Sequence, residues 1–262
     1  MKKRERFNQI VNDIKNLKIQ GAKEIAKKGF YAYSLFPTEK SRKKLLSLRP
    51  TEPLLSNVLK KKSYSGVLEH FDFTQKKINK SVCSLIKSND VIFTHCHSST
   101  VVDALVYAKK QKKKFEVYNT ETRPLFQGRK TFQKLRREKI KVTMFIDSAV
   151  GVALSKEQGT KKVDKVFLGA DAIQKDGIVN KIGSETIARI ANQEKIPVYI
   201  LADSWKFSLK KIELEKRGFK EIWNKIKGIE NPAFEFVPKK YITKIISEFG
   251  VLDYDKFLKR VK

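Results

Sequence analysis

The sequence predicts an α/β protein in which an N-terminal helical domain, residues 1–87, precedes a parallel-sheet domain, residues 88–262. Two observations lead to this prediction. Up to residue 87 the apolar residues recur at the three- and four-residue spacing of amphipathic helices, and no strand pattern precedes residue 90. Beyond residue 90, short apolar runs with strand character alternate with helical stretches, which is typical of a parallel sheet covered by helices on both faces.

The helical pattern of the first domain begins near the N-terminus. Phe7, Ile10 and Ile14 fall on one face of a helix, and similar patterns follow over residues 22–35 and 64–86.

The strand pattern of the second domain consists of short runs rich in β-branched and aromatic residues. A tight hairpin turn is predicted at Asp176-Gly177, between Ile173 and Ile178. Because strands separated by helices form a parallel sheet, we expect this domain to be Rossmann-like. The predicted strands lie at residues 91–93, 115–118, 142–146, 166–168 and 198–201.

The charge of the chain is unusual for a globular protein. The 262 residues include 57 basic and 28 acidic side chains, which gives a formal net charge of +29, whereas the 40% of hydrophobic residues suffice for a core. Such a surface attracts nucleic acid, acidic proteins and phosphorylated metabolites. The basic residues are spread along the whole chain, so they can equally be ordinary solvated surface charge.

Cysteine content and hydropathy indicate the compartment. The two cysteines, Cys83 and Cys96, exclude a scaffold of several disulfides and fit a reducing environment. No signal-peptide pattern follows the charged N-terminus, and no run of about 18 apolar residues is present. We therefore expect a cytoplasmic protein without a membrane span.

Polar side chains gather after the predicted strands. In an open α/β sheet, ligands bind at the carboxyl ends of the strands, so the residues that follow each strand are candidates for a site. These segments contain a thiol, several carboxylates and an arginine. They are residues 94–100, 119–123, 147–148, 169–171 and 203–204.

Cys96 stands out among these residues because a helix is predicted to start directly after it. A helix N-terminus binds phosphate and lowers the pKa of a nearby thiol, although a buried and inert cysteine is the common alternative. His95 and His97 flank Cys96, but adjacent strand residues point to opposite faces. We therefore expect no metal site there.

The other strand-end residues have less specific interpretations. Asp171 follows two small residues and is equally interpreted as a general acid/base or as a cap of a turn or helix. Asp147 precedes a segment that can start a helix, which favours a capping role. Arg123 is a candidate phosphate ligand or a solvated surface residue.

Several motifs together resemble one known family. It contains archaeal ribose-1,5-bisphosphate isomerases, methylthioribose-1-phosphate isomerases and the alpha, beta and delta subunits of initiation factor 2B. The similar segments are residues 94–98, 120–124 with 127–129, 147–149, 169–171, 180–183 and 231–234.

The resemblance implies a function and a set of site residues. The isomerases of the family use a cysteine and an aspartate, which correspond to Cys96 and Asp171. The residues after Cys96 are more similar to those of the ribose-1,5-bisphosphate enzymes. The implied reaction converts ribose 1,5-bisphosphate to ribulose 1,5-bisphosphate in nucleoside monophosphate salvage, with neither a cofactor nor a metal. The residues implied to bind this phosphosugar are Gly21, Ala22, Arg49, Ser98, Arg123, Asn180 and Lys181.

The resemblance leaves alternatives open. An initiation factor 2B-like subunit that contacts initiation factor 2 or nucleic acid is one, and methylthioribose-1-phosphate isomerase is another. Relatives assemble as homodimers and as hexamers that are trimers of dimers. One departure concerns Gln20, which stands where enzymes of the family carry arginine.

Overall fold

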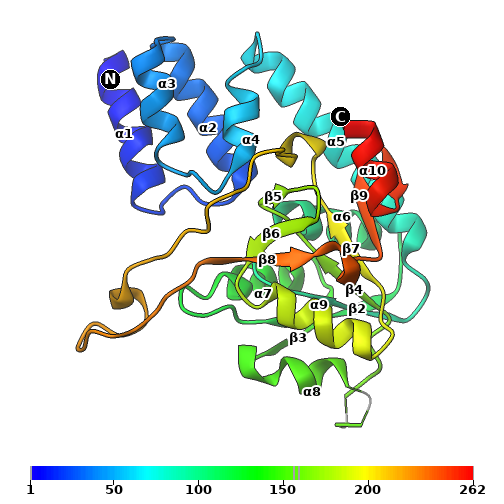
Figure 1. The fold of residues 1–262 in the computed structure, drawn as a ribbon. Coiled ribbons are helices and arrows are strands. Elements are labelled where there is room, and N and C mark those ends of the chain that lie inside the picture. Colours follow the sequence, from blue (N-terminus) through cyan, green and yellow to red (C-terminus); the bar gives the residue numbers. More distant parts are fainter. Residues whose placement is uncertain (1, 156, 159, 262) are drawn as a thin grey trace.

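The structure is a computed structural model that describes residues 2–155, 157–158 and 160–261. Its N-terminal region is helical (Figure 1). The apolar residues of the first helix, which include Phe7, Ile10 and Ile14, are buried in a core that they share with the second and third helices. Side chains of Thr38 and Ser63 cap the third and fifth helices by accepting backbone N–H bonds. The helices are α1 (Lys3–Lys15), α2 (Ala22–Leu35), α3 (Glu39–Leu46), α4 (Pro53–Val58) and α5 (Tyr64–Leu85).

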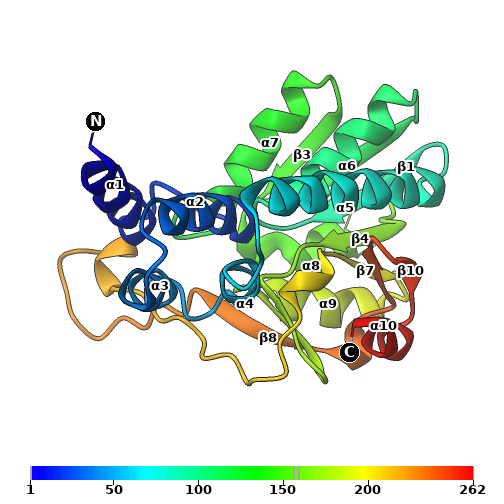
Figure 2. The same ribbon diagram turned by 90° about the horizontal axis from the view of Figure 1, so that it is seen from above.

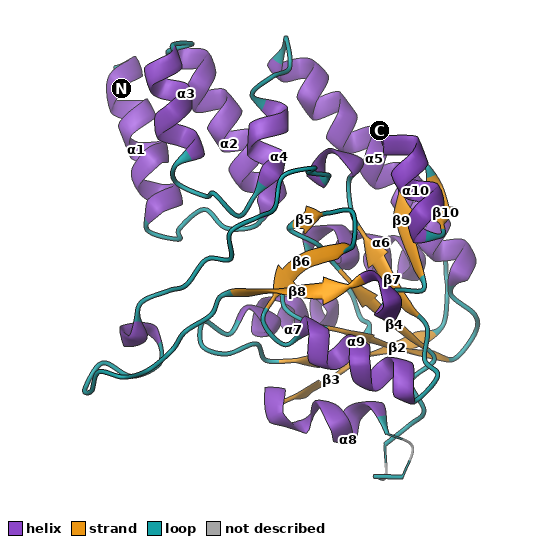
Figure 3. Ribbon diagram, in the orientation of Figure 1, coloured by secondary structure: helices purple, strands orange, loops and turns teal. Residues whose placement is uncertain are grey.

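A twisted sheet forms the centre of the rest of the molecule (Figure 3). Its strands run in the order β10-β9-β7-β4-β1-β2-β3, and all neighbours are parallel except the edge pair β9 and β10. This topology confirms the predicted α/β fold class. The strands are β1 (Asp90–Thr94), β2 (Phe115–Thr120), β3 (Lys141–Phe145), β4 (Lys165–Leu168), β7 (Val198–Leu201), β9 (Lys244–Ser247) and β10 (Gly250–Leu252).

Helices cover both faces of this sheet, as Figure 2 shows. Alternate residues of β1 belong to different cores: Ile92 packs with α5, α6 and α7, whereas Val91 and Phe93 pack with α8, α9 and α10. This alternation is the pleat of a strand buried on both sides. The helices after α5 are α6 (Ser99–Lys110), α7 (Gln127–Arg137), α8 (Val150–Leu154), α9 (Ser184–Gln193) and α10 (Tyr254–Val261).

A second, antiparallel sheet lies beside the first. The hairpin predicted at Asp176-Gly177 joins two of its strands, and a later strand pairs with the second of these. Its strands are β5 (Ala172–Ile173), β6 (Gly177–Lys181) and β8 (Phe234–Pro238). The sequence analysis did not find β8, β9 or β10.

A long segment, residues 202–233, connects β7 to β8 and passes close to the helical region (Figure 1). Thr51 Oγ1 donates to the carbonyl of Glu213 over 3.2 Å, and Arg49 forms an ion pair with Glu215 over 3.0 Å. The segment therefore links the helical region to the sheet. The 3-10 turns of the molecule are η1 (Asp147–Ala149), η2 (Ser204–Lys206), η3 (Phe219–Glu221) and η4 (Lys239–Tyr241).

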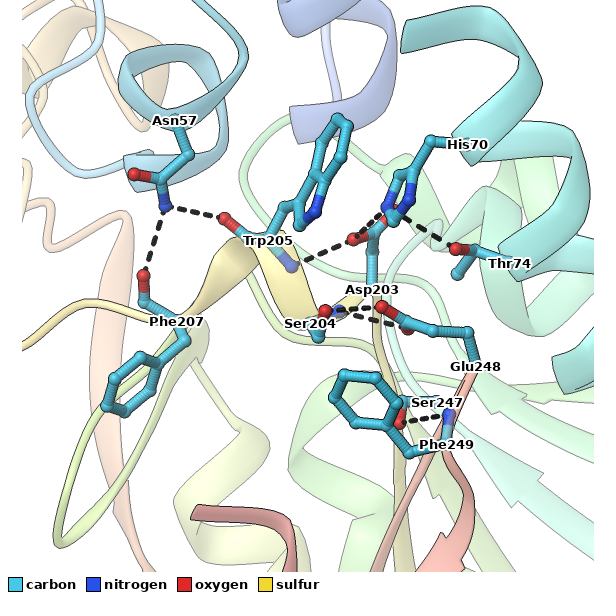
Figure 4. Close-up of polar contacts among 10 residues, drawn as sticks. All are labelled: Asn57, His70, Thr74, Asp203, Ser204, Trp205, Phe207, Ser247, Glu248 and Phe249. Atoms are coloured by element: carbon cyan, nitrogen blue, oxygen red, sulfur yellow. Dashed lines mark hydrogen bonds and ion pairs between the residues drawn. The ribbon is translucent and has the colours of Figure 1, made fainter. Parts of the chain in front are cut away.

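The start of this segment forms a clasp with α4 and α5, which Figure 4 shows. The imidazole of His70 stacks on the indole of Trp205 with 3.4 Å between centroids, and its Nε2 lies 3.0 Å from Asp203 Oδ1. Asn57 Nδ2 donates to the carbonyls of Trp205 and Phe207 over 2.8 and 3.1 Å. These contacts hold α4 and α5 of the helical region against the segment that follows β7.

The helix α5 belongs to both regions. Val67 and Phe71 lie in the core of the helical region, whereas Ile78, Val82 and Ile86 lie in a core beneath the sheet. The division of the chain at residue 87 into separate domains stays a prediction. Within the described ranges, no helix combines the length and apolar character that crossing a bilayer requires.

Candidate active site

A cavity of about 300 Å³ opens where the carboxyl ends of the strands meet the helical region and the 202–233 segment. It brings together most of the residues predicted from sequence. Those that line it are Gly21, Ala22, Arg49, Cys96, Ser98, Asp171, Asn180 and Lys181.

The backbone at Cys96 is held in an unusual conformation. Its φ angle is +62°, in the left-handed region that costs a non-glycine residue about 1–3 kcal/mol. Two threonines stabilise it: Thr122 Oγ1 accepts the Cys96 N–H over 3.0 Å, and Thr131 Oγ1 donates to its carbonyl over 2.7 Å. Strain that is maintained by specific partners is typical of functional sites. This turn directs Cys96 into the cavity wall.

The protonation state of the thiol differs from our expectation. Burial raises the pKa of Cys96 to about 11, and the ammonium group of Lys181 opposes this shift. From the sequence, a lowered pKa is expected because the N-terminus of a helix follows Cys96. That expectation is wrong because Ser98 is the N-cap of α6, so Cys96 lies outside the first turn and the desolvation of the thiol dominates. At neutral pH the thiol is therefore mostly protonated.

Asp171 lies in the same wall, at the junction between β4 and β5. Its backbone N–H donates to the carbonyl of Val179 over 2.8 Å. Gly169 permits a close approach here, because a Cβ at this position would stand 2.6 Å from Ser98 Oγ. Burial raises the pKa of the Asp171 carboxyl, opposed by the ammonium groups of Lys206 and Lys181. The neighbouring helices α6 and α9 begin at other N-caps, Ser98 and Gly183, so the helix-cap alternative finds no support.

Positive charge dominates the cavity wall. Lys181 is buried, with its Nζ 4.4 Å from the centroid of Phe234, and Lys206 Nζ donates to the carbonyl of Ala170. The acidic residues of the cavity wall are Glu52 and Asp171. Such an excess suits a ligand with several phosphate charges. The cationic lining residues are Lys18, Lys23, Arg49, Lys130, Lys181, Lys206 and Arg217.

Gly21 and Ala22 bring the start of α2 to the cavity. Gly21 is the N-cap with a φ angle of +83°, a conformation that favours glycine, and no side chain caps this helix. Free N–H groups at a helix N-terminus bind anions. The Gln20 side chain donates to the carbonyl of Leu17 over 2.6 Å, while Lys18 and Lys23 supply cations on either side of it.

Arg123 does not reach the cavity. Its backbone N–H and that of Thr122 donate to the carboxylate of Asp147 over 2.6 and 2.8 Å. The expectation that Asp147 caps the helix behind it is therefore wrong, because its carboxylate holds the loop after β2 and the N-cap of α8 is Ala149, without a side-chain cap. The exposed guanidinium lies 5.2 Å from the centroid of Phe126. The structure thus separates Arg123 from the other predicted residues, and its contact with substrate stays a prediction.

The histidines beside Cys96 have separate partners. His95 Nε2 lies 2.8 Å from the carbonyl of Ile182, and His97 Nδ1 lies 3.0 Å from Thr131 Oγ1. Burial lowers the pKa of His95 to about 4, so it is neutral. The two rings therefore secure the turn around Cys96 from different directions.

Some cavity residues were missed by the sequence analysis. Lys206 lies shortly after β7 and could have been found by the rule that searches strand ends. Glu52 and Arg217 come from the start of α4 and from the 202–233 segment, and no local sequence signal marks them.

Comparisons with known proteins identify the family of this chain. Residues 59–254 match the Initiation factor 2 subunit family. The chain belongs to this family. A ribose 1,5-bisphosphate isomerase of Methanocaldococcus jannaschii is 36% identical, over 91% of this chain and 89% of the relative. The resemblance stated from the motifs is thereby confirmed.

Relatives with a different name are similar over the same length. A putative translation initiation factor eIF-2B subunit 2-like protein of Pyrococcus furiosus is 29% identical, over 95% of this chain and 96% of that protein. The crystal structure of a Pyrococcus horikoshii translation initiation factor eIF-2B matches with a TM-score of 0.83 at 28% identity, covering 95% of this chain and 97% of the other. Family membership therefore leaves the choice between enzyme and binding subunit to the cavity itself.

Proposed function

We propose that this chain is a ribose 1,5-bisphosphate isomerase that forms ribulose 1,5-bisphosphate. The observation that carries the proposal is the joint placement of Cys96 and Asp171 in one cavity whose wall holds an excess of cations. A binding subunit has no need for a strained cysteine beside a half-buried carboxyl. The isomerase named in Methanocaldococcus jannaschii supports the choice of substrate.

The reaction requires ring opening and the transfer of a proton from C2 to C1 of the sugar. Asp171 is suited to give its proton to the ring oxygen as the bond from that oxygen to C1 breaks, since its raised pKa favours the acid form. It then recovers a proton from the C2 hydroxyl as the C2 carbonyl forms. Cys96, as the thiolate, removes the proton from C2 and returns it to C1. Lys181 is the cation that stabilises this thiolate, because its ammonium group is the principal influence that lowers the Cys96 pKa. Enediolate charge is stabilised by the surrounding cations.

The direct test is to incubate the purified protein with ribose 1,5-bisphosphate and to measure ribulose 1,5-bisphosphate. Methylthioribose 1-phosphate is tested in parallel, because the family resemblance includes an isomerase of that substrate. We expect turnover of the bisphosphate, since the cavity is lined by cations. Turnover of methylthioribose 1-phosphate alone would identify that compound as the substrate in place of the bisphosphate. Turnover of neither compound would favour the initiation factor 2B-like alternative.

Two further properties belong to the same proposal. We propose that the enzyme is a homodimer or a hexamer formed as a trimer of dimers, which light scattering on the purified chain measures. We also propose a cytoplasmic location, on the basis of the low cysteine content, which fits a reducing compartment.

A further inference from the structure

Glu52 is a buried acid in the cavity that the mechanism above does not use. It is the N-cap residue of α4 and lines the same cavity as Cys96 and Asp171. The residue is 6% exposed. Among the described residues its Oε2 atom has no hydrogen-bond partner. Buried polar atoms are rarely left without one, so the missing partner points to a ligand.

The cationic side chains near Glu52 are bonded to other groups. Arg49 NH1 pairs with Glu215 over 3.0 Å, and its NH2 donates to the carbonyl of Ile14 over 3.1 Å. Lys206 donates to the carbonyl of Ala170. The side chain of Glu52 makes no capping hydrogen bond to α4. Neither an ion pair nor a helix cap therefore accounts for a carboxyl at this position.

The surroundings favour the neutral form of this carboxyl. Burial raises the pKa of Glu52 to about 8, and the charges of Asp171 and Glu215 act in the same direction. Arg49 and Lys206 oppose the shift. Glu52 is thus mostly a carboxylic acid at neutral pH, with a proton that it can donate in a hydrogen bond.

We propose that Glu52 contacts the substrate as a neutral carboxylic acid and donates a hydrogen bond to a sugar oxygen beside Asp171. This inference rests on the proposed isomerase function. The oxygen is the one on C2, a hydroxyl in the substrate and the carbonyl of the product, because the oxygens on C1 and C5 carry the phosphate groups that the cations of the wall bind. A hydrogen bond to that oxygen strengthens as its negative charge develops, so Glu52 is a catalytic residue and stays protonated throughout.

The test compares two substitutions that separate the donor from the charge. Glu52→Gln keeps an N–H donor but cannot ionise, whereas Glu52→Leu removes the donor and keeps a similar volume. Glu39→Gln is the matched control, since Glu39 is an exposed residue at the start of α3 in the same region. Values of kcat/KM are measured from pH 6 to 10, together with melting temperatures.

We expect Glu52→Leu to lose about 10²–10³-fold in kcat/KM, the usual effect of removing one donor to an oxyanion. Below pH 8 the Glu52→Gln enzyme stays within about tenfold of the wild type. Above the pKa of about 8 the wild type loses the donor, so the ratio of Glu52→Gln to wild type rises about tenfold per pH unit. The titration of Cys96 affects both enzymes alike and cancels in this ratio.

Two results would overturn the inference: full activity of Glu52→Leu, or a Glu52→Gln to wild-type ratio that stays constant with pH. If Glu52→Leu does not fold, the ratio for Glu52→Gln decides alone. An inactive wild type would mean that the proposed function fails, and calorimetry of ribose 1,5-bisphosphate binding then tests Glu52 separately. At pH 9, binding to the wild type should take up a proton and binding to Glu52→Gln should not. Equal proton uptake by both, or no binding, would contradict the role of Glu52.

Discussion

The two sides of the cavity are built in different ways. On one side Cys96 and Asp171 follow β1 and β4 directly, so the hydrogen bonds of a parallel sheet place them. On the other side Arg49 and Arg217 come from the helical region and the 202–233 segment, which side-chain contacts hold in place. Cys96 and Asp171, which exchange protons in the proposed reaction, therefore lie on the side built on the sheet, whereas Arg49 and Arg217 depend on tertiary contacts. Substitutions on the two sides should therefore differ in kind.

The largest effect is expected on the sheet side, at Cys96. Cys96→Ser should reduce kcat by about 10²–10⁴-fold, because one acid/base group typically contributes this much. The free thiol has a pKa of about 11 and acts as the thiolate, so the thiolate fraction available for catalysis rises with pH below that value. Steady-state kinetics measures both effects.

Cys83→Ser is the matched control, since Cys83 packs beside the core under α5 and α6 and does not line the cavity. It should leave kcat/KM nearly unchanged. Equal losses in the two variants would show that the Cys96 effect is not chemical.

A somewhat smaller loss is expected at Asp171, where Asp171→Asn keeps the size of the side chain but cannot exchange a proton. Turnover should fall about 10²–10³-fold while the melting temperature and bisphosphate binding stay near those of the wild type. Asp176→Asn, in the exposed hairpin turn that follows, is the control. Normal turnover by Asp171→Asn would show that the role of Asp171 is structural.

On the other side of the cavity the effect should appear in KM. Arg217 Nε and Arg49 NH1 both lie 3.0 Å from Oε1 of Glu215, so the three residues form one ion-pair network at the wall. A charge-assisted hydrogen bond is worth about 1.5–3 kcal/mol, and Arg217→Met should therefore reduce kcat/KM about 10–150-fold, mainly by raising KM. Lys216→Met, on an exposed neighbour, should leave both constants unchanged. A loss confined to kcat would place Arg217 among the reacting groups.

The same division explains what could be predicted from the sequence. The strand-end rule found Cys96 and Asp171 because one parallel sheet aligns the ends of its strands at one edge. It did not find Glu52 or Arg217, because neither belongs to the sheet and only the packing of distant segments brings them to it. Arg123 was placed near the site by its position after β2, but Asp147 holds the backbone of that loop and the guanidinium stays exposed. The thiol pKa depends on burial, which a sequence does not give.

The smallest catalytic effect is expected at the clasp between the two sides, where His70 stacks on Trp205 and contacts Asp203. His70→Ala removes a stacked aromatic pair and a hydrogen bond to a carboxylate, which together contribute about 1–3 kcal/mol to the free energy of unfolding. Asp203 retains the N–H of Trp205, over 2.8 Å, so it is not left without a partner. Because the clasp positions the helical region and touches no predicted site residue, kcat should change less than about threefold, and KM should rise more than kcat falls.

Urea unfolding followed by circular dichroism and by tryptophan fluorescence measures this last effect, since Trp205 lies in the clasp. Glu69→Ala, an exposed neighbour of His70 on α5, is the control and should leave the unfolding free energy within about 0.5 kcal/mol of the wild type. If His70→Ala lowers the urea midpoint seen by fluorescence but not the midpoint seen by circular dichroism, the helical region separates from the sheet before either region unfolds. A loss of kcat as large as that of Asp171→Asn, at unchanged stability, would contradict the comparison, because the clasp would then act on the reacting groups themselves.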